Sequence, residues 1–155
     1  MSIWLEQGLA AAHQLSAAAW FGALVYRTFF VDPKAKQFFE RGSDYERYSL
    51  QLAHGMRGVV LLALLVCGGS GFILLGLRWN SSEIWQTLMA AKIAVWLTAF
   101  GVFTYISWVY WPKRVFIVET EYRQMRRQGL FLSLVMIAFA GFGIVLGQCG
   151  QVWQK

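Results

Sequence analysis

The sequence predicts an all-α fold, a bundle of four transmembrane helices, and three observations predict it. The 155-residue chain is 57% hydrophobic and only 14% charged, whereas soluble domains are typically about 45–50% apolar and about 25% charged. The hydrophobic residues are gathered into four long runs, and crossing a bilayer takes about 20 mostly apolar residues. The runs are continuous rather than alternating, which excludes a β-barrel. The length fits a single domain, 1–155.

The four runs place the helices at about 5–29, 50–77, 84–111 and 129–148. Because the connections between them are short, neighbouring helices are expected to be antiparallel, in an up-down-up-down order. The opening residues, from Met1 to Glu6, lack the basic segment of a cleavable signal peptide. We therefore expect the first run to be retained as a helix.

The basic residues predict the orientation of the helices. Cytoplasmic loops of membrane proteins carry an excess of Lys and Arg. The two long loops hold nine of them, namely Lys34, Lys36, Arg41, Arg47, Lys113, Arg114, Arg123, Arg126 and Arg127. The other side holds only Arg78 and Lys155. We therefore expect both long loops to face the cytoplasm and both termini to lie outside.

The same two long loops carry acidic residues between the basic ones: Asp32, Glu40, Asp44, Glu46, Glu119 and Glu121. This mixture predicts short amphipathic helical extensions whose charges are solvated at the membrane surface. The formal net charge of +6 is spread between the apolar runs. It therefore favours a lipid bilayer as partner and argues against nucleic acid.

No motif in the sequence assigns an enzymatic reaction, and catalytic residues stay unknown. The chain has no Walker motif, dinucleotide fingerprint or nucleophile elbow. Its cysteines, Cys67 and Cys149, form neither a zinc-binding pattern nor a CxxC motif.

Ionisable residues within the apolar runs are the first candidates for function, because a charge in hydrocarbon is costly. His13 and Lys92 each lie about eight residues below the outer end of their helices, about 12 Å inward at 1.5 Å per residue. Met89 is one turn from Lys92 and joins that level. The alternative is structural: the histidine hydrogen-bonds a neighbouring helix, the lysine reaches the interface and the methionine fills space.

A second group lies near the cytoplasmic end of the second run: His54, Met56 and Arg57. His54 and Met56 are candidate metal ligands, and Arg57 is a candidate cofactor contact or an anchor to lipid headgroups. Since His13 and His54 belong to opposite halves of the membrane, they are not expected to be the two axial ligands of one haem.

The segment from His13 to Leu24, HQLSAAAWFGAL, resembles the first helix of the CopD family of bacterial inner-membrane proteins, which are associated with copper resistance and uptake. That family's third helix carries a lysine and ends in basic residues. It resembles the segments Ala91-Lys92-Ile93-Ala94-Val95 and Pro112-Lys113-Arg114 of this chain. The resemblance covers nearly the whole chain. It implies a protein that handles copper or haem in a bacterial inner membrane, and the outer side, with both termini, would then be the periplasm.

Two related kinds of bundle share parts of this layout. HemJ-type protoporphyrinogen oxidases are similar in placing a histidine in helix one and a lysine in helix three, which His13 and Lys92 match, with Arg57 as a looser candidate. Bacterial di-haem b-type cytochromes place histidines early in helices one and two, as His13 and His54 are here. They also need histidines in the fourth helix, and 129–148 has none.

Three functions follow as hypotheses. The first is a CopD-like protein with copper held by His13 and Met89 on the outer side and by His54 and Met56 on the inner side, moving copper across the membrane. The second is an oxidase or electron carrier with one haem b on His13, Lys92 supplying the second ligand or pairing with a propionate. The third is a non-catalytic subunit or assembly factor of a larger membrane complex. A periplasmic metal or redox partner is compatible with the first two.

Overall fold

The computed structural model describes residues 3–79, 82–116 and 119–152, and the residues in these ranges are almost entirely helical. They form four long rods. The first rod consists of α1 (Ile3–Tyr26), η1 (Arg27–Val31) and α2 (Asp32–Phe38), and the second is α3 (Gly42–Leu77). The third consists of α4 (Glu83–Tyr105), η2 (Ile106–Tyr110) and α5 (Trp111–Arg114). The turn η3 (Glu119–Glu121) precedes the fourth, α6 (Tyr122–Val152).

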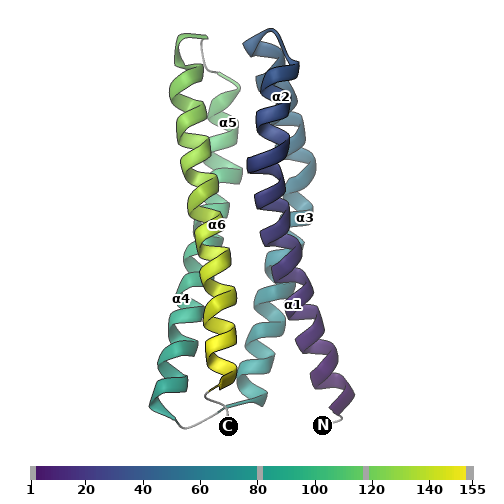
Figure 1. Ribbon diagram of the computed structural model, residues 1–155, viewed down its shortest axis with the longest axis vertical. Helices are drawn as coiled ribbons and strands as arrows, with labels where there is room; N and C mark the ends of the chain where they lie inside the picture. The colour runs from purple at the N-terminus through teal and green to yellow at the C-terminus, as the bar shows by residue number, and fades with distance from the viewer. Residues whose placement is uncertain (1–2, 80–81, 117–118, 153–155) are drawn as a thin grey trace.

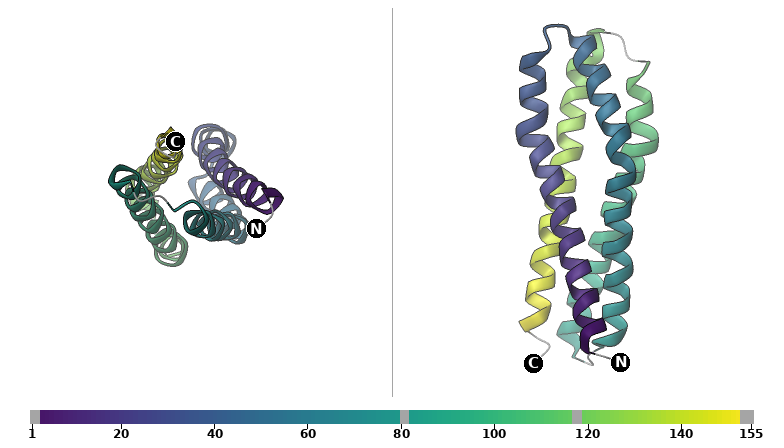
Figure 2. Two further views of the ribbon diagram at one scale, coloured as in Figure 1. Left: turned by 90° about the horizontal axis from the view of Figure 1, so that it is seen from below. Right: turned by 90° about the vertical axis from the view of Figure 1, so that its right-hand side faces the viewer.

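The four rods lie side by side, and successive rods run in opposite directions, so that Ile3 and Val152 are at the same end (Figures 1 and 2). We call this the terminal end and the opposite one the loop end. Each of the four rods is long and apolar enough to cross a membrane. Their outward faces carry large exposed apolar side chains, such as Leu15, Leu62 and Phe131.

The rods extend beyond the predicted helices. The first continues past residue 29 to Phe38 and the third past residue 111 to Arg114, while α3 and α6 begin before residues 50 and 129. The two continuations pass through the wide helical turns η1 and η2, each closely followed by a proline, Pro33 or Pro112. A proline lacks the N–H and pushes the preceding turn away, and the chain absorbs this by widening the helix instead of ending it.

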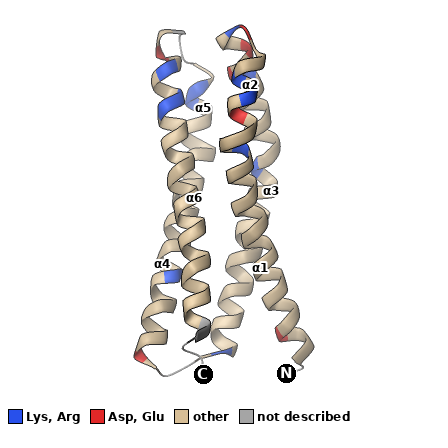
Figure 3. Cartoon of the chain, in the orientation of Figure 1, with Lys and Arg blue, Asp and Glu red and all other residues tan. Residues whose placement is uncertain are grey.

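Charged residues gather at the loop end, and the middle of the rods carries few of them (Figure 3). A large buried core cluster lies near the middle and is built from all four rods by Trp20, Leu64, Ala99, Phe103, Met136 and Ala140. Trp20, Ala99 and Ala140 of this cluster also line a cavity that extends toward the terminal end. The core therefore separates the cavity from the charged loop end.

Candidate functional site

The terminal half of the bundle contains a cavity of about 370 Å³, lined by α1, α3, α4 and α6. We call it the terminal cavity. Its volume falls in the range of small-molecule and cofactor sites, about 300–1,000 Å³. The lining is mostly apolar and aromatic. Among the lining residues, those that can bind a metal, carry a charge or donate a hydrogen bond include His13, Cys67, Arg78, Trp85, Met89 and Lys92.

His13 is held in one tautomer by its neighbours on α3 and α4. Its Nδ1 lies 2.8 Å from the backbone carbonyl oxygen of Cys67, and a carbonyl can only accept, so Nδ1 carries the proton and donates it. The other ring nitrogen, Nε2, is 3.3 Å from Nζ of Lys92 and accepts from it. The basic nitrogen of the imidazole therefore faces Lys92, and the two residues predicted to share a level do meet.

The Nδ1 side of the ring is enclosed by polar atoms of α3. The hydroxyl oxygen of Ser70 is 3.4 Å from Nδ1, and the Cys67 sulfur is 3.8 Å from it. The Ser70 hydroxyl also contacts the carbonyl oxygen of Cys67, at 3.2 Å. The backbone carbonyl of Cys67 thus orients His13. A role of the backbone at this position could not be predicted from the residue type.

Two glycines make the room that these side chains need. A methyl group at Gly71 would lie 2.9 Å from Cε1 of His13, and one at Gly147 would lie 3.0 Å from Nζ of Lys92. Real Cβ atoms rarely come this close to a neighbour. Gly71 of α3 and Gly147 of α6 are therefore the positions where His13 and Lys92 rest against backbone.

This packing predicts opposite effects at two neighbouring glycines. Gly71→Ala should push the imidazole of His13 out of its position and weaken any ligand bound through Nε2, because the ring cannot yield without losing its bond to Cys67. Gly69→Ala meets nothing within 4 Å and should stabilise the helix by about 0.5–1 kcal/mol. Ligand titration and thermal unfolding of both variants test this; equal ligand affinity in the two would contradict it.

The residues predicted for a site in the outer half of the membrane share one cavity, and those predicted near the cytoplasmic end of the second helix do not line it. Met89 lines the terminal cavity with His13 and Lys92. His54 is exposed on the outside of α3, and Met56 is only partly buried. The guanidinium of Arg57 lies 5.3 Å from the centre of the Trp108 ring, and none of these three residues lines the cavity.

Two tryptophans that line the terminal cavity carry buried indole N–H groups without a partner. Within the described ranges, Nε1 of Trp20 and Nε1 of Trp85 have no hydrogen-bond acceptor. A buried donor without an acceptor is destabilising and calls for an explanation, such as a bound molecule.

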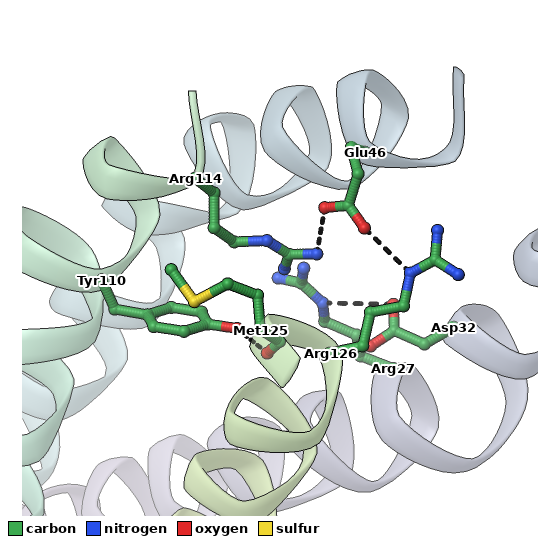
Figure 4. A network of polar contacts seen from close by, with 7 residues as sticks. All are labelled: Arg27, Asp32, Glu46, Tyr110, Arg114, Met125 and Arg126. Atoms are coloured by element: carbon green, nitrogen blue, oxygen red, sulfur yellow. Dashed lines mark hydrogen bonds and ion pairs between the residues drawn. The ribbon is translucent and has the colours of Figure 1, made fainter. Parts of the chain in front are cut away.

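A second polar cluster, at the loop end, joins all four rods (Figure 4). Glu46 of α3 accepts hydrogen bonds from Arg114 of α5 and from Nε of Arg126 on α6, the latter at 2.9 Å. In the first rod, Nε of Arg27 lies 3.7 Å from Oδ1 of Asp32.

Aromatic rings cover the same cluster. The guanidinium groups of Arg27 and Arg114 lie 4.9 Å and 4.6 Å from the centre of the Trp111 ring. The hydroxyl of Tyr110 donates to the carbonyl oxygen of Met125, 2.8 Å away. The expectation that the loop charges are solvated is wrong for Glu46 and Arg114, whose side chains are only 7% and 5% exposed.

No three His, Cys, Asp or Glu side chains come together as a metal-binding group within the ranges 3–79, 82–116 and 119–152. No protein family, curated protein or solved structure with which the chain was compared matches it.

Proposed function

We propose that the four rods cross a bacterial inner membrane, with the loop end in the cytoplasm and the terminal end in the periplasm. The apolar outward faces support the crossing, and the basic loop end supports the orientation. In a Cys149→Ser background, an impermeant maleimide should modify Glu83→Cys in intact cells and Ser43→Cys only after lysis. The reverse pattern would overturn the orientation.

Within this membrane we propose that the protein holds one haem b in the terminal cavity, with Nε2 of His13 as an axial ligand. The observation that carries this proposal is the hydrogen bond from His13 Nδ1 to the Cys67 carbonyl. Histidines that ligate metals typically donate their other ring N–H to a carbonyl or carboxylate, which fixes the ring and leaves the second nitrogen basic. His13 already has this arrangement.

The rest of the cavity supports a flat aromatic ligand. Trp20, Phe72 and Trp96 provide apolar ring surfaces, and glycines of α3 and α6 let a macrocycle approach the backbone. The donor set also favours haem. A porphyrin brings four nitrogen ligands to its iron, so that one or two protein ligands suffice, and the cavity provides one imidazole with a lysine beside it.

Lys92 has two roles open to it in this arrangement. Its ammonium lies within a mostly apolar cavity with Nε2 of His13 as its hydrogen-bond acceptor. When the imidazole binds a ligand, Lys92 must give up that bond. It could then help to hold the group in one of two ways, as a second ligand after loss of its proton or, as the ammonium, by pairing with a carboxylate. A bound haem would supply one-electron chemistry, and the enclosed position of His13 would limit the access of water to the ligated nitrogen.

The experiment that tests the proposal is the visible spectrum of protein purified from membranes, together with its iron and copper content. We expect a Soret band and about one haem per chain. Protein that is free of haem after expression with ample haem supply, and that gives no Soret shift on addition of haemin, would overturn the proposal.

Copper is the second candidate, and one observation favours it. Cys67 and Met89 line the same cavity as His13, so thiol and thioether donors of the kind that copper prefers border the same space as the imidazole. Stoichiometric copper in the same sample, lost in Cys67→Ser and without a Soret band, would select this function.

The resemblance to the CopD family agrees with either candidate, haem or copper. The similarity to HemJ-type oxidases agrees with the haem candidate, and His13 and Lys92 would then be a pair in a redox enzyme. A non-catalytic subunit is the third reading, and a stoichiometric partner in protein purified without haem or copper would support it instead.

A further inference from the structure

We infer that Arg78 receives a carboxylate group of the ligand at the rim of the terminal cavity, and that Glu6 holds this position until the ligand arrives. The inference rests on the proposed function and specifies its ligand class: an apolar ring system with a carboxylate on one edge. It assigns a role to Glu6 and to Arg78, the latter of which the sequence analysis used only to predict orientation.

Arg78 combines access to the cavity with access to the outside. It lines the terminal cavity, and its Nε donates to Oε1 of Glu6 at 2.7 Å. The side chains of Arg78 and Glu6 are 32% and 37% exposed. An ion pair this exposed contributes little to stability, so an incoming carboxylate can replace that of Glu6 without disturbing the fold.

Arg78 and Glu6 lie at the depth along the bundle where the outer edge of a ligand bound to His13 would be. Arg78 is seven residues beyond Gly71, against which His13 packs, and this corresponds to about 10 Å along a helix. Glu6 precedes His13 by the same seven residues on α1. A macrocycle bound through His13 would therefore extend toward Arg78 with its carboxylate-bearing edge outermost.

Two further observations indicate an anion at this rim. Trp85 lines the cavity, and its buried N–H has no acceptor in the described part of the chain. The centre of its ring is 5.8 Å from that of Trp79, the residue that follows Arg78. An arginine at the terminal end is also unexpected, because the excess of basic residues that orients the bundle lies at the loop end. Guanidinium is the side-chain group best suited to binding a carboxylate by two parallel hydrogen bonds.

The experiment uses the full-length protein in detergent, prepared without haem, and follows the fluorescence of metal-free protoporphyrin IX and of its dimethyl ester. Arg78→Gln should weaken the binding of the free acid about tenfold, as expected for the loss of a charge-assisted hydrogen bond. Glu6→Gln should strengthen it, because Arg78 no longer has a competing carboxylate. Neither change should alter the binding of the ester.

Arg57→Gln is the matched control, since Arg57 does not line the cavity, and it should leave both affinities unchanged. Arg78→Lys keeps the charge and should fall between wild type and Arg78→Gln. If Arg78→Gln binds the free acid as tightly as wild type does, while His13→Ala loses the haemin Soret shift, the inference fails and the proposed function stands. If the wild-type protein binds neither porphyrin and also gives no Soret shift with haemin, both fail.

Discussion

Glu46→Gln is expected to reduce the free energy of unfolding by about 3–5 kcal/mol, the usual cost of removing one partner from a buried ion pair. Glutamine keeps the size of the side chain but not its charge. The guanidinium of Arg114, with 5% of its side chain exposed, would then lose the carboxylate to which it donates. Arg126 would lose the same partner, and the contact between α3, α5 and α6 would weaken. Unfolding by sodium dodecyl sulfate, followed by circular dichroism, measures the loss.

Glu6→Gln is the matched control, because it removes the same charge from an exposed ion pair. We expect it to cost less than about 1 kcal/mol. Replacing both partners, as in Glu46→Leu with Arg114→Met, should recover much of the loss, since an apolar pair can substitute for a buried ionic one. Equal stability of Glu46→Gln and Glu6→Gln would show that the network does not hold the loop end together.

The second large effect is expected at His13, where substitution by alanine should abolish the specific binding of haem. The cavity would keep its apolar walls and Lys92, but it would lose the nitrogen that the Cys67 carbonyl orients. The Soret band of purified His13→Ala should be absent or shifted to that of loosely held haem. Absorbance at constant protein concentration and the haem stoichiometry report the change.

His54→Ala provides the comparison, because it removes the other histidine of the chain from an exposed position. It should retain the wild-type spectrum and stoichiometry. If His54→Ala loses the haem and His13→Ala retains it, the site lies in the other half of the bundle and the terminal cavity has another role.

The number of membrane-spanning rods could be predicted from the sequence, because each hydrophobic run corresponds to one of the four rods of sufficient length in the described residues. The positions of the helix ends could not be predicted. Pro33 and Pro112 look like helix breakers in sequence, yet each sits in the first turn of a continuing helix, where a proline is tolerated.

The candidate site was predictable as far as depth along a helix determines it. His13 and Lys92 could be placed at one level from the rise per residue. The rotation of each helix about its axis was not accessible, because α1 and α4 are nearly as apolar on one face as on another. The contact of His13 with the Cys67 carbonyl and the exposure of His54 both depend on that rotation.

Glu46 illustrates a different limit. In sequence it stands among charged residues, a pattern typical of a solvated surface. In the folded chain, residues from other rods surround it, with Arg114 and Arg126 separated from it by 68 and 80 positions. Such long-range pairing is visible only once the rods are assembled.

The ligation of a haem by Nε2 of His13 is the central claim, and chemical rescue tests it most directly. The variant His13→Gly, titrated with haemin and then with free imidazole, should show a weak and altered Soret band that returns to the wild-type position as imidazole enters the vacated space. A wild-type spectrum in His13→Gly before any imidazole is added would contradict the account.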